Sequence, residues 1–243
     1  MATRQQIAEY REAQQALTAV VEDELRTIWD SVRGLPLDDM RDVLVSEVPA
    51  LIDRYGSVGQ AVAAEWYEDL VKARAFIPDL YAPDAWASST RWALSPLYQA
   101  GDDVSAFTLL VSATSRHVLN QGRHTISRSV ARSPGVRYAR VLGGSDPCAF
   151  CRVLASRGPV YGSRDSALLS DGEKYHDKCY CQPVPMRGEW VQDSNSERGE
   201  TWEGDSIPGY DFDKMYSEDY LPHAGGSLSD VAAEMRKAVP GSR

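Results

Sequence analysis

The four cysteines of this 243-residue chain fall in one short stretch, where the pair Cys148-x-x-Cys151 precedes His176, Cys179 and Cys181. Thiolate sulfur and imidazole nitrogen are the donors that tetrahedral zinc prefers, and a structural zinc site uses four of them. The tight Cys-x-x-Cys turn lets both sulfurs reach one ion, and a helix that follows it favours the thiolate form. The spacing therefore predicts a zinc site built from these five residues.

The spacing leaves open which of Cys179 and Cys181 completes the site. In an extended segment, side chains two residues apart point to the same face, so either or both could approach the ion. His176 could also leave the ligand set to an all-cysteine site and donate a hydrogen bond from outside it. No carboxylate stands at a spacing typical of a water-activating metal site. We therefore expect a closed, structural ion that contributes about 10 kcal/mol or more to folding.

Two other interpretations of the cysteines remain open. The Cys148 and Cys151 pair could form a redox disulfide, although the βαβ pattern that flanks such pairs in thioredoxin-like proteins is missing. The four cysteines could also be free thiols. No secretion signal precedes the first polar helical pattern, so we expect synthesis in a reducing cytoplasm, where clustered cysteines more often bind metal. About one zinc ion per purified chain is the expected outcome of elemental analysis.

The region before the cysteines must position them, and its apolar residues recur at helical spacing. Pro49 should kink or restart the second helix, Gly56 should end it, and Ser57 should cap the next. A connector with two prolines is expected over residues 77–89. Helices are predicted at about residues 5–32, 37–55, 57–76, 90–99 and 103–131.

The C-terminal part mixes short predicted elements with a strongly acidic segment. Strands are predicted over residues 136–142, 159–161 and 182–186, and helices over 149–156 and 227–239. Between Glu189 and Asp219, ten acidic residues face two basic ones, which indicates an extended acidic arm whose aromatic residues touch a surface. The predicted fold class is mainly α. It comprises a helical domain (1–135), a small zinc-stapled α+β domain (136–188) and an acidic, partly irregular tail (189–243).

Charge is distributed unevenly along the chain. The net charge of −9 argues against a surface that coats nucleic acid, and no apolar run is long enough to span a membrane. Between Asp103 and Asp146, however, there is no acidic residue, while arginines accumulate. This strip could be a solvated helix face or a contact for phosphates or an acidic partner. The candidate contact residues are Arg116, Arg123, Arg128 and Arg132.

The cysteine region also resembles a known family. The segments 139–141, 148–151, 154–158 and 175–181 are together similar to the MuF-like minor head proteins of tailed bacteriophages, the head morphogenesis family. The likeness is strongest to versions from phages of actinobacteria, and residues 7–17 also look like the start of those proteins. The combined motif covers about residues 138–185, and beyond it the likeness is one of helical texture.

This resemblance implies a low-copy minor capsid protein that acts in head morphogenesis near the portal. It would be made in the host cytoplasm and located inside the capsid, with portal, major capsid or scaffold proteins and packaged DNA as partners. Some relatives are labelled capsid maturation proteases, so a prohead protease is the alternative. No Gly-x-Ser-x-Gly motif occurs, and no catalytic residue is assigned. A nucleic-acid-binding zinc module fits less well, because only Arg152 and Arg157 accompany the cysteines.

Overall fold

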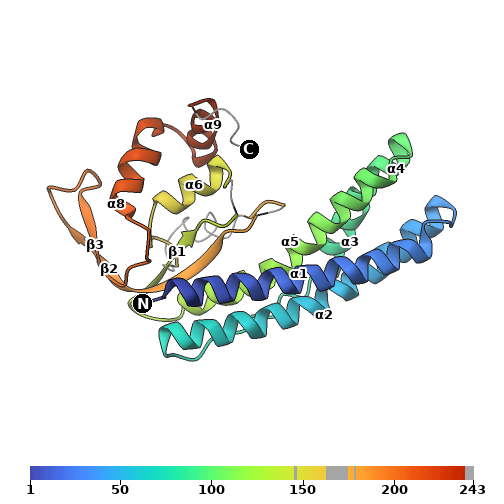
Figure 1. Ribbon diagram of the computed structural model, residues 1–243, viewed down its shortest axis with the longest axis horizontal. Coiled ribbons are helices and arrows are strands. Elements are labelled where there is room, and N and C mark those ends of the chain that lie inside the picture. Colours follow the sequence, from blue (N-terminus) through green and yellow to red (C-terminus); the bar gives the residue numbers. More distant parts are fainter. Residues whose placement is uncertain (145–146, 163–174, 178, 239–243) are drawn as a thin grey trace.

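The computed structural model describes residues 1–144, 147–162, 175–177 and 179–238. A long helical arm leads to a smaller end that carries a three-stranded sheet and several short helices (Figure 1). The chain is therefore mainly helical with a small sheet, in line with the predicted class. The three-part division of the chain stays a prediction, and residue 239 of the expected last helix lies outside the described residues.

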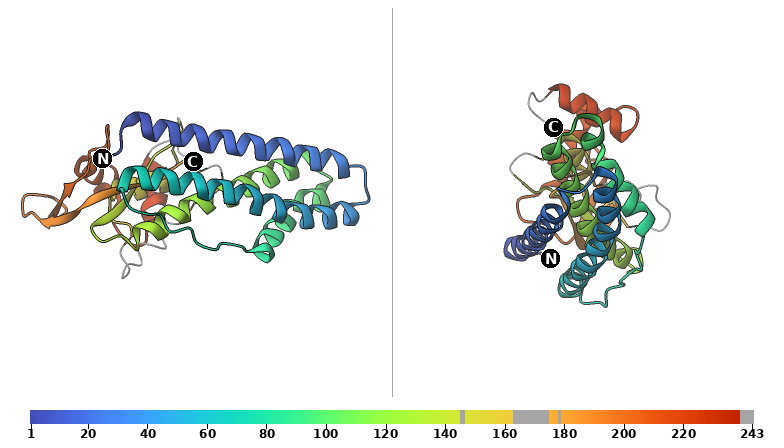
Figure 2. Two further views of the ribbon diagram at one scale, coloured as in Figure 1. Left: turned by 90° about the horizontal axis from the view of Figure 1, so that it is seen from below. Right: turned by 90° about the vertical axis from the view of Figure 1, so that its right-hand side faces the viewer.

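Two long antiparallel helices, α1 (Arg4–Val32) and α2 (Leu37–Val71), run side by side along the arm (Figure 2). A capping box begins α1, because the Thr3 hydroxyl accepts from the Gln6 amide at 3.1 Å and the Gln6 side chain accepts from the Thr3 amide at 3.0 Å. Val21, Leu25 and Trp29 of α1 are buried. The predicted first helix and the break after it are confirmed.

The expected interruption of the second helix at Pro49 and Gly56 is wrong, because α2 continues through both. The buried neighbours Val48, Leu51 and Ile52 offset the backbone hydrogen bond that Pro49 cannot donate. At Gly56, a Cβ atom would lie 2.6 Å from the Gln121 side chain. The glycine therefore serves close contact with a neighbouring helix rather than helix termination.

The arm is completed by α3 (Pro83–Ala93), α4 (Ser95–Ala100) and α5 (Asp103–Val130). The predicted connector is too long, since α3 already begins at Pro83, a residue suited to the first position of a helix. Trp86 is buried and holds this first turn against the arm. The start of α5 is confirmed, and Asp102 caps it by accepting from the Ser105 amide at 2.9 Å.

The sheet has the antiparallel order β1-β2-β3, formed by β1 (Val136–Val141), β2 (Gln182–Gln192) and β3 (Glu200–Gly204). The predicted strand over 159–161 reduces to one bridge between Tyr138 and Tyr161. β2 extends beyond its predicted end and pairs with β3, which the acidic composition concealed. The rings of Trp190 and Trp202 face each other across this pair, 5.7 Å apart, and stabilise it.

The acidic segment and the last helix lie on the small end of the molecule rather than extending away from it. The helix α6 (Ala149–Ser156) has the predicted bounds, and α9 (Leu228–Ala238) packs against it through Val231 and Met235. In the chain, α9 is preceded by α8 (Phe212–Met215) and by the short helical turns Tyr216–Tyr220 and Leu221–His223. One hydrophobic cluster joins Trp66, Tyr138 and Phe212, so the arm, the sheet and the tail share a core.

Among the described helices, none combines the length and the apolar character needed to cross a lipid bilayer.

Candidate metal centre

The cysteine cluster forms where the start of α6 meets the segment that enters β2. Cys148 is the N-cap residue of α6, and its sulfur accepts from the Cys151 amide at 3.4 Å. The His176 Nε2 atom lies 3.0 Å from Cys148 Sγ and 3.5 Å from Cys151 Sγ. Cys151 Sγ also lies 3.5 Å from Cys179 Sγ. The fold therefore gathers residues that are far apart in the sequence around the Cys151 sulfur.

The donor atoms form two groups that share Cys151, one with Cys148 and His176 and the other with Cys179 and Cys181. Within each group, all donor atoms lie within 4.8 Å of one another. Tetrahedral zinc, with bonds of about 2.3 Å to sulfur and about 2.0 Å to nitrogen, holds its sulfurs about 3.8 Å apart and sulfur and nitrogen about 3.5 Å apart. The distances of 3.5 Å from Cys151 Sγ to His176 Nε2 and to Cys179 Sγ are close to these values. The structure thus places the five predicted ligands in two overlapping groups of three, each of which could hold a metal ion.

Two buried arginines surround the cluster. Arg140 of β1 has no exposed surface, and its Nη2 atom lies 3.8 Å from Cys179 Sγ and 3.9 Å from Cys151 Sγ. Arg123 of α5 donates to the Cys179 carbonyl oxygen. The ring of Tyr175 contacts both guanidinium groups, at 3.7 Å from Arg140 Cζ and 4.0 Å from Arg123 Cζ. Because zinc with three or four thiolates carries net negative charge, these cations would compensate the charge of a bound ion.

The thiols and the imidazole of the cluster have pKa values far from their usual ranges. The hydrogen bond with Cys151, aided by the one with His176, lowers the pKa of Cys148 to about 4 against the effect of burial. The hydrogen bond with Cys148 raises the pKa of His176 to about 9. Hydrogen bonding with Cys151 lowers the pKa of Cys179, whereas hydrogen bonding with Cys148 raises that of Cys151. Metal binding therefore requires Cys151 and His176 to release protons.

The pKa of Arg140 reflects the same thiolates. Burial is the largest influence and acts to lower the pKa of Arg140, but electrostatic interactions with Tyr175 and with the cysteines at 181, 179 and 151 together raise it above its usual range. Burial also raises the pKa of Tyr175 to about 12, so this ring is a neutral phenol between two cations at neutral pH. The guanidinium of Arg140 therefore stays charged inside the protein and is held there by sulfur.

The predicted basic strip is divided between the interior and the surface. Arg123 is 2% exposed, so its expected contact with a partner is corrected to a contact with the cluster. Arg116 is partly buried and pairs with Asp177 at 2.5 Å. Arg128 is partly exposed, whereas Arg132 is exposed and lies over the Phe76 ring at 3.6 Å. The predicted contact role of Arg128 and Arg132 stays a prediction.

Sequence reasoning missed Arg140 and Tyr175 as neighbours of the cluster. A signal was present, because the arginine-rich interval without acidic residues immediately precedes four cysteines. Arginines with no carboxylate nearby in the sequence can instead form charge-assisted hydrogen bonds with a buried group of thiolates. The strip thus has a structural explanation that the linear sequence did not supply.

His117 of α5 gives a pH-dependent prediction. Burial, with a smaller effect from Arg116, lowers its pKa to about 4, and its Nε2 atom has no hydrogen-bond partner among the described residues. The folded chain therefore binds fewer protons than the unfolded chain between pH 6.5 and 4, and stability falls as the pH drops through this window. His117→Gln should weaken this loss in urea unfolding at pH 7 and pH 5. His223→Gln is the control, and equal pH dependence in wild type and His117→Gln would contradict the prediction.

Comparisons with known proteins give one family and one curated relative. A family model described as VG15 protein matches residues 1–220. A Gene 15 protein of Mycobacterium phage D29 is 42% identical over 77 residues, which make up 30% of this chain and 28% of that protein. The match therefore spans just over a quarter of the relative's length. No solved structure matches the chain.

Proposed function

Because the chain belongs to the VG15 protein family, we propose that it is a minor capsid protein of a tailed bacteriophage, with a structural role in head morphogenesis near the portal. The observation that carries this proposal is the family match over residues 1–220, together with a relative that a mycobacteriophage encodes. The likeness of the cysteine motif to MuF-like minor head proteins supports the same role. The proposed location is the capsid interior.

The ion is proposed to be zinc in a structural role. The donors around Cys151 are sulfur and imidazole nitrogen, the set that a closed tetrahedral zinc site uses. The neighbouring carboxylate of Asp177 is engaged by Arg116, which leaves it poorly placed to activate a metal-bound water. Such a site would fasten the start of α6 to the entry of β2. It would thereby hold the small end of the molecule in shape during assembly.

Portal, major capsid and scaffold proteins are the proposed partners, with packaged DNA as a further contact. Arg128, partly exposed near the end of α5, and Arg132, exposed just beyond it, are the members of the basic strip proposed for this contact. Surface guanidiniums suit both acidic protein surfaces and phosphates. The contact would be weakened by salt, because exposed charges are screened within about 10 Å at 0.1 M ionic strength.

Co-expression with the portal, scaffold and major capsid proteins of the same phage tests the role. We expect the chain to enter proheads at low copy and to co-purify with the portal, with no cleavage of the other proteins. Arg128→Glu with Arg132→Glu should reduce this incorporation several-fold, because the proposed contact uses both positive charges. Arg91→Glu, an exposed arginine of α3 outside the strip, is the matched control.

The outcomes separate the alternatives. Specific cleavage of capsid or scaffold protein that disappears when one Ser or His of this chain is replaced would identify a prohead protease and overturn the proposal. Absence of the chain from proheads and from portal fractions would also overturn it. Unchanged incorporation of the Arg128 and Arg132 double variant would show that the strip is a solvated helix face without a partner contact.

A further inference from the structure

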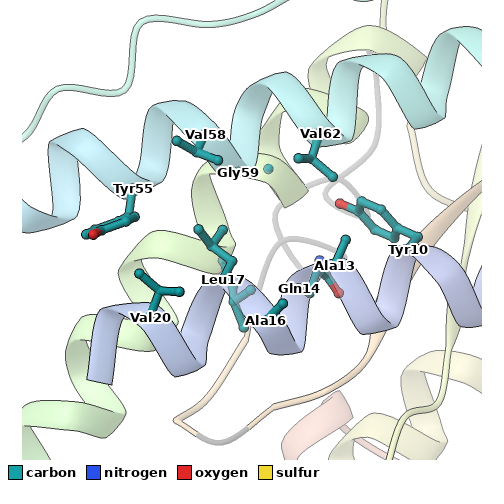
Figure 3. Close-up of a pocket in the computed structure, with 12 residues that line it drawn as sticks. Tyr10, Ala13, Gln14, Ala16, Leu17, Val20, Tyr55, Val58, Gly59 and Val62 are labelled. Atoms are coloured by element: carbon teal, nitrogen blue, oxygen red, sulfur yellow. The ribbon is translucent and has the colours of Figure 1, made fainter. Parts of the chain in front are cut away.

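An apolar groove runs between α1 and α2 in the middle of the arm (Figure 3). Ala16, Leu17 and Val20 of α1 face Val58 and Val62 of α2 across it. Its volume is about 310 Å³, and its lining is almost entirely carbon. Since a cavity of about 150 Å³ accommodates one benzene ring, the groove has room for about two apolar side chains.

The groove follows from unequal packing of the three long helices. α2 and α5 touch closely at Gly59 and Gly122, where a Cβ atom on Gly122 would lie 2.7 Å from the Gly59 carbonyl oxygen. Side chains on α1 keep that helix farther from α2 than α5 is. Leu119 of α5 also lines the groove between α1 and α2. Val20 and Val58 are 50% and 47% exposed at the rim. Apolar side chains at a rim with half their surface in water favour a further apolar covering.

The helices that flank the groove carry almost all of the net negative charge of the chain. Residues 4–71 contain fourteen Asp and Glu but six Arg and no Lys, a net charge of −8 out of −9 for the whole chain. Glu9 and Glu12 are exposed on α1 one turn before groove residues, and Glu65 is exposed on α2 one turn after Val62. The apolar groove is therefore bordered by carboxylates on both sides.

Two arginines of the flanking helices are already engaged. Arg54 pairs with Glu24 at 2.6 Å, and Arg11 donates to the Leu142 carbonyl oxygen at 3.0 Å. The carboxylates of Glu9, Glu12 and Glu65 thus set the sign of the electrostatic potential at the rim. A binding partner gains from cationic groups that meet these carboxylates outside an apolar contact.

We propose that this groove docks an amphipathic helix of another protein, whose apolar stripe enters between α1 and α2 while Lys and Arg on its flanks meet the acidic rim. Helix-in-groove binding of this kind uses apolar anchors three and four residues apart. The groove contains none of the proposed metal ligands and neither Arg128 nor Arg132, so the inference does not depend on the proposed function. A second copy of the arm would bring acidic helices together, and nucleic acid or an anionic membrane would be repelled.

A designed helix of about five turns, with a leucine stripe flanked by lysines, provides the probe. Fluorescence anisotropy with the full chain should show salt-sensitive binding of this peptide. A scrambled peptide of the same composition without the stripe, and one with Glu in place of Lys, should each bind at least tenfold more weakly. Ala16→Trp, which fills the groove from an exposed position, should also weaken binding at least tenfold.

Ala19→Trp is the matched control, because residue 19 is exposed on α1 but does not line the groove. Circular dichroism melting checks that both variants stay folded. Equal binding of the lysine and glutamate peptides, equal binding by the Ala16 and Ala19 variants, or no binding of the leucine–lysine peptide would each overturn the proposal. Self-association in solution that Ala16→Trp abolishes would assign the groove to a second copy and overturn it as well.

Discussion

Cys151→Ser is expected to abolish stoichiometric metal binding and to destabilise the sheet-bearing end of the protein. The Cys151 sulfur is the one shared by both groups of donors, 3.5 Å from His176 Nε2 and 3.5 Å from Cys179 Sγ. A structural zinc ion contributes about 10 kcal/mol or more of apparent binding energy, as much as the total stability of a typical domain. Elemental analysis and thermal unfolding with and without a chelator measure the effect.

Cys181→Ser is the matched control for this experiment. Arg140 approaches the sulfurs of Cys151 and Cys179, and a guanidinium donor favours the thiolate form that binds metal. We therefore expect Cys179 to be the fourth ligand, so that Cys179→Ser loses the ion and Cys181→Ser retains it. Loss of the ion from Cys181→Ser alone would reverse the assignment of the two cysteines. A fully metallated Cys151→Ser protein would rule out the proposed site.

Arg140→Met is expected to lower the free energy of unfolding by about 3–5 kcal/mol, the cost of leaving one partner of a buried charged group uncompensated. The side chain has no exposed surface, and the Tyr175 ring lies against it at 3.7 Å. Methionine fills part of the volume but neither donates to sulfur nor carries charge. Metal affinity should fall as well, because the net negative charge of the zinc–thiolate group loses its neighbouring cation.

Chemical denaturation of the metal-loaded protein and competition with a chromophoric chelator measure the two effects. Arg140→Lys should recover part of the metal affinity, since it keeps the charge but not the geometry of the guanidinium. Arg137 lies on the same strand at a partly exposed position, so Arg137→Met should change stability by much less than Arg140→Met. If the Arg140 and Arg137 methionine variants were equally stable and bound metal equally well, Arg140 would not compensate the site.

The elements with strong local signals were predictable from the sequence. The helical period marks α1 and α5, and the start of α6 follows from Cys148 at its N-cap. The five proposed ligands were predicted from residue type and spacing, and the fold places them in two groups of three that could hold a metal ion. For the helices, the physical cause acts within one or two turns of the chain, so the sequence displays it directly.

The errors arose where distant contacts override local preference. Gly56 resembles a helix stop until Gln121 is seen against it, and Pro49 resembles a break until its buried neighbours are counted. The acidic composition of β3 gave no sign of a strand. The strand forms because it pairs with β2, where Trp202 lies opposite Trp190. These contacts join residues that only the folded chain places together, and they outweigh preferences worth about 1–3 kcal/mol.

The sequence by itself determined the helical character of the arm, the residue types of the candidate metal centre and the acidic charge of α1 and α2. The tertiary structure decided that Arg123 and Arg140 face the cysteines while Arg132 faces solvent, and that α1 stands away from α2 to leave a groove. The physical reason is that burial and charge compensation depend on packing between elements. A one-dimensional pattern specifies which side of a helix is apolar, but not which neighbour will cover it.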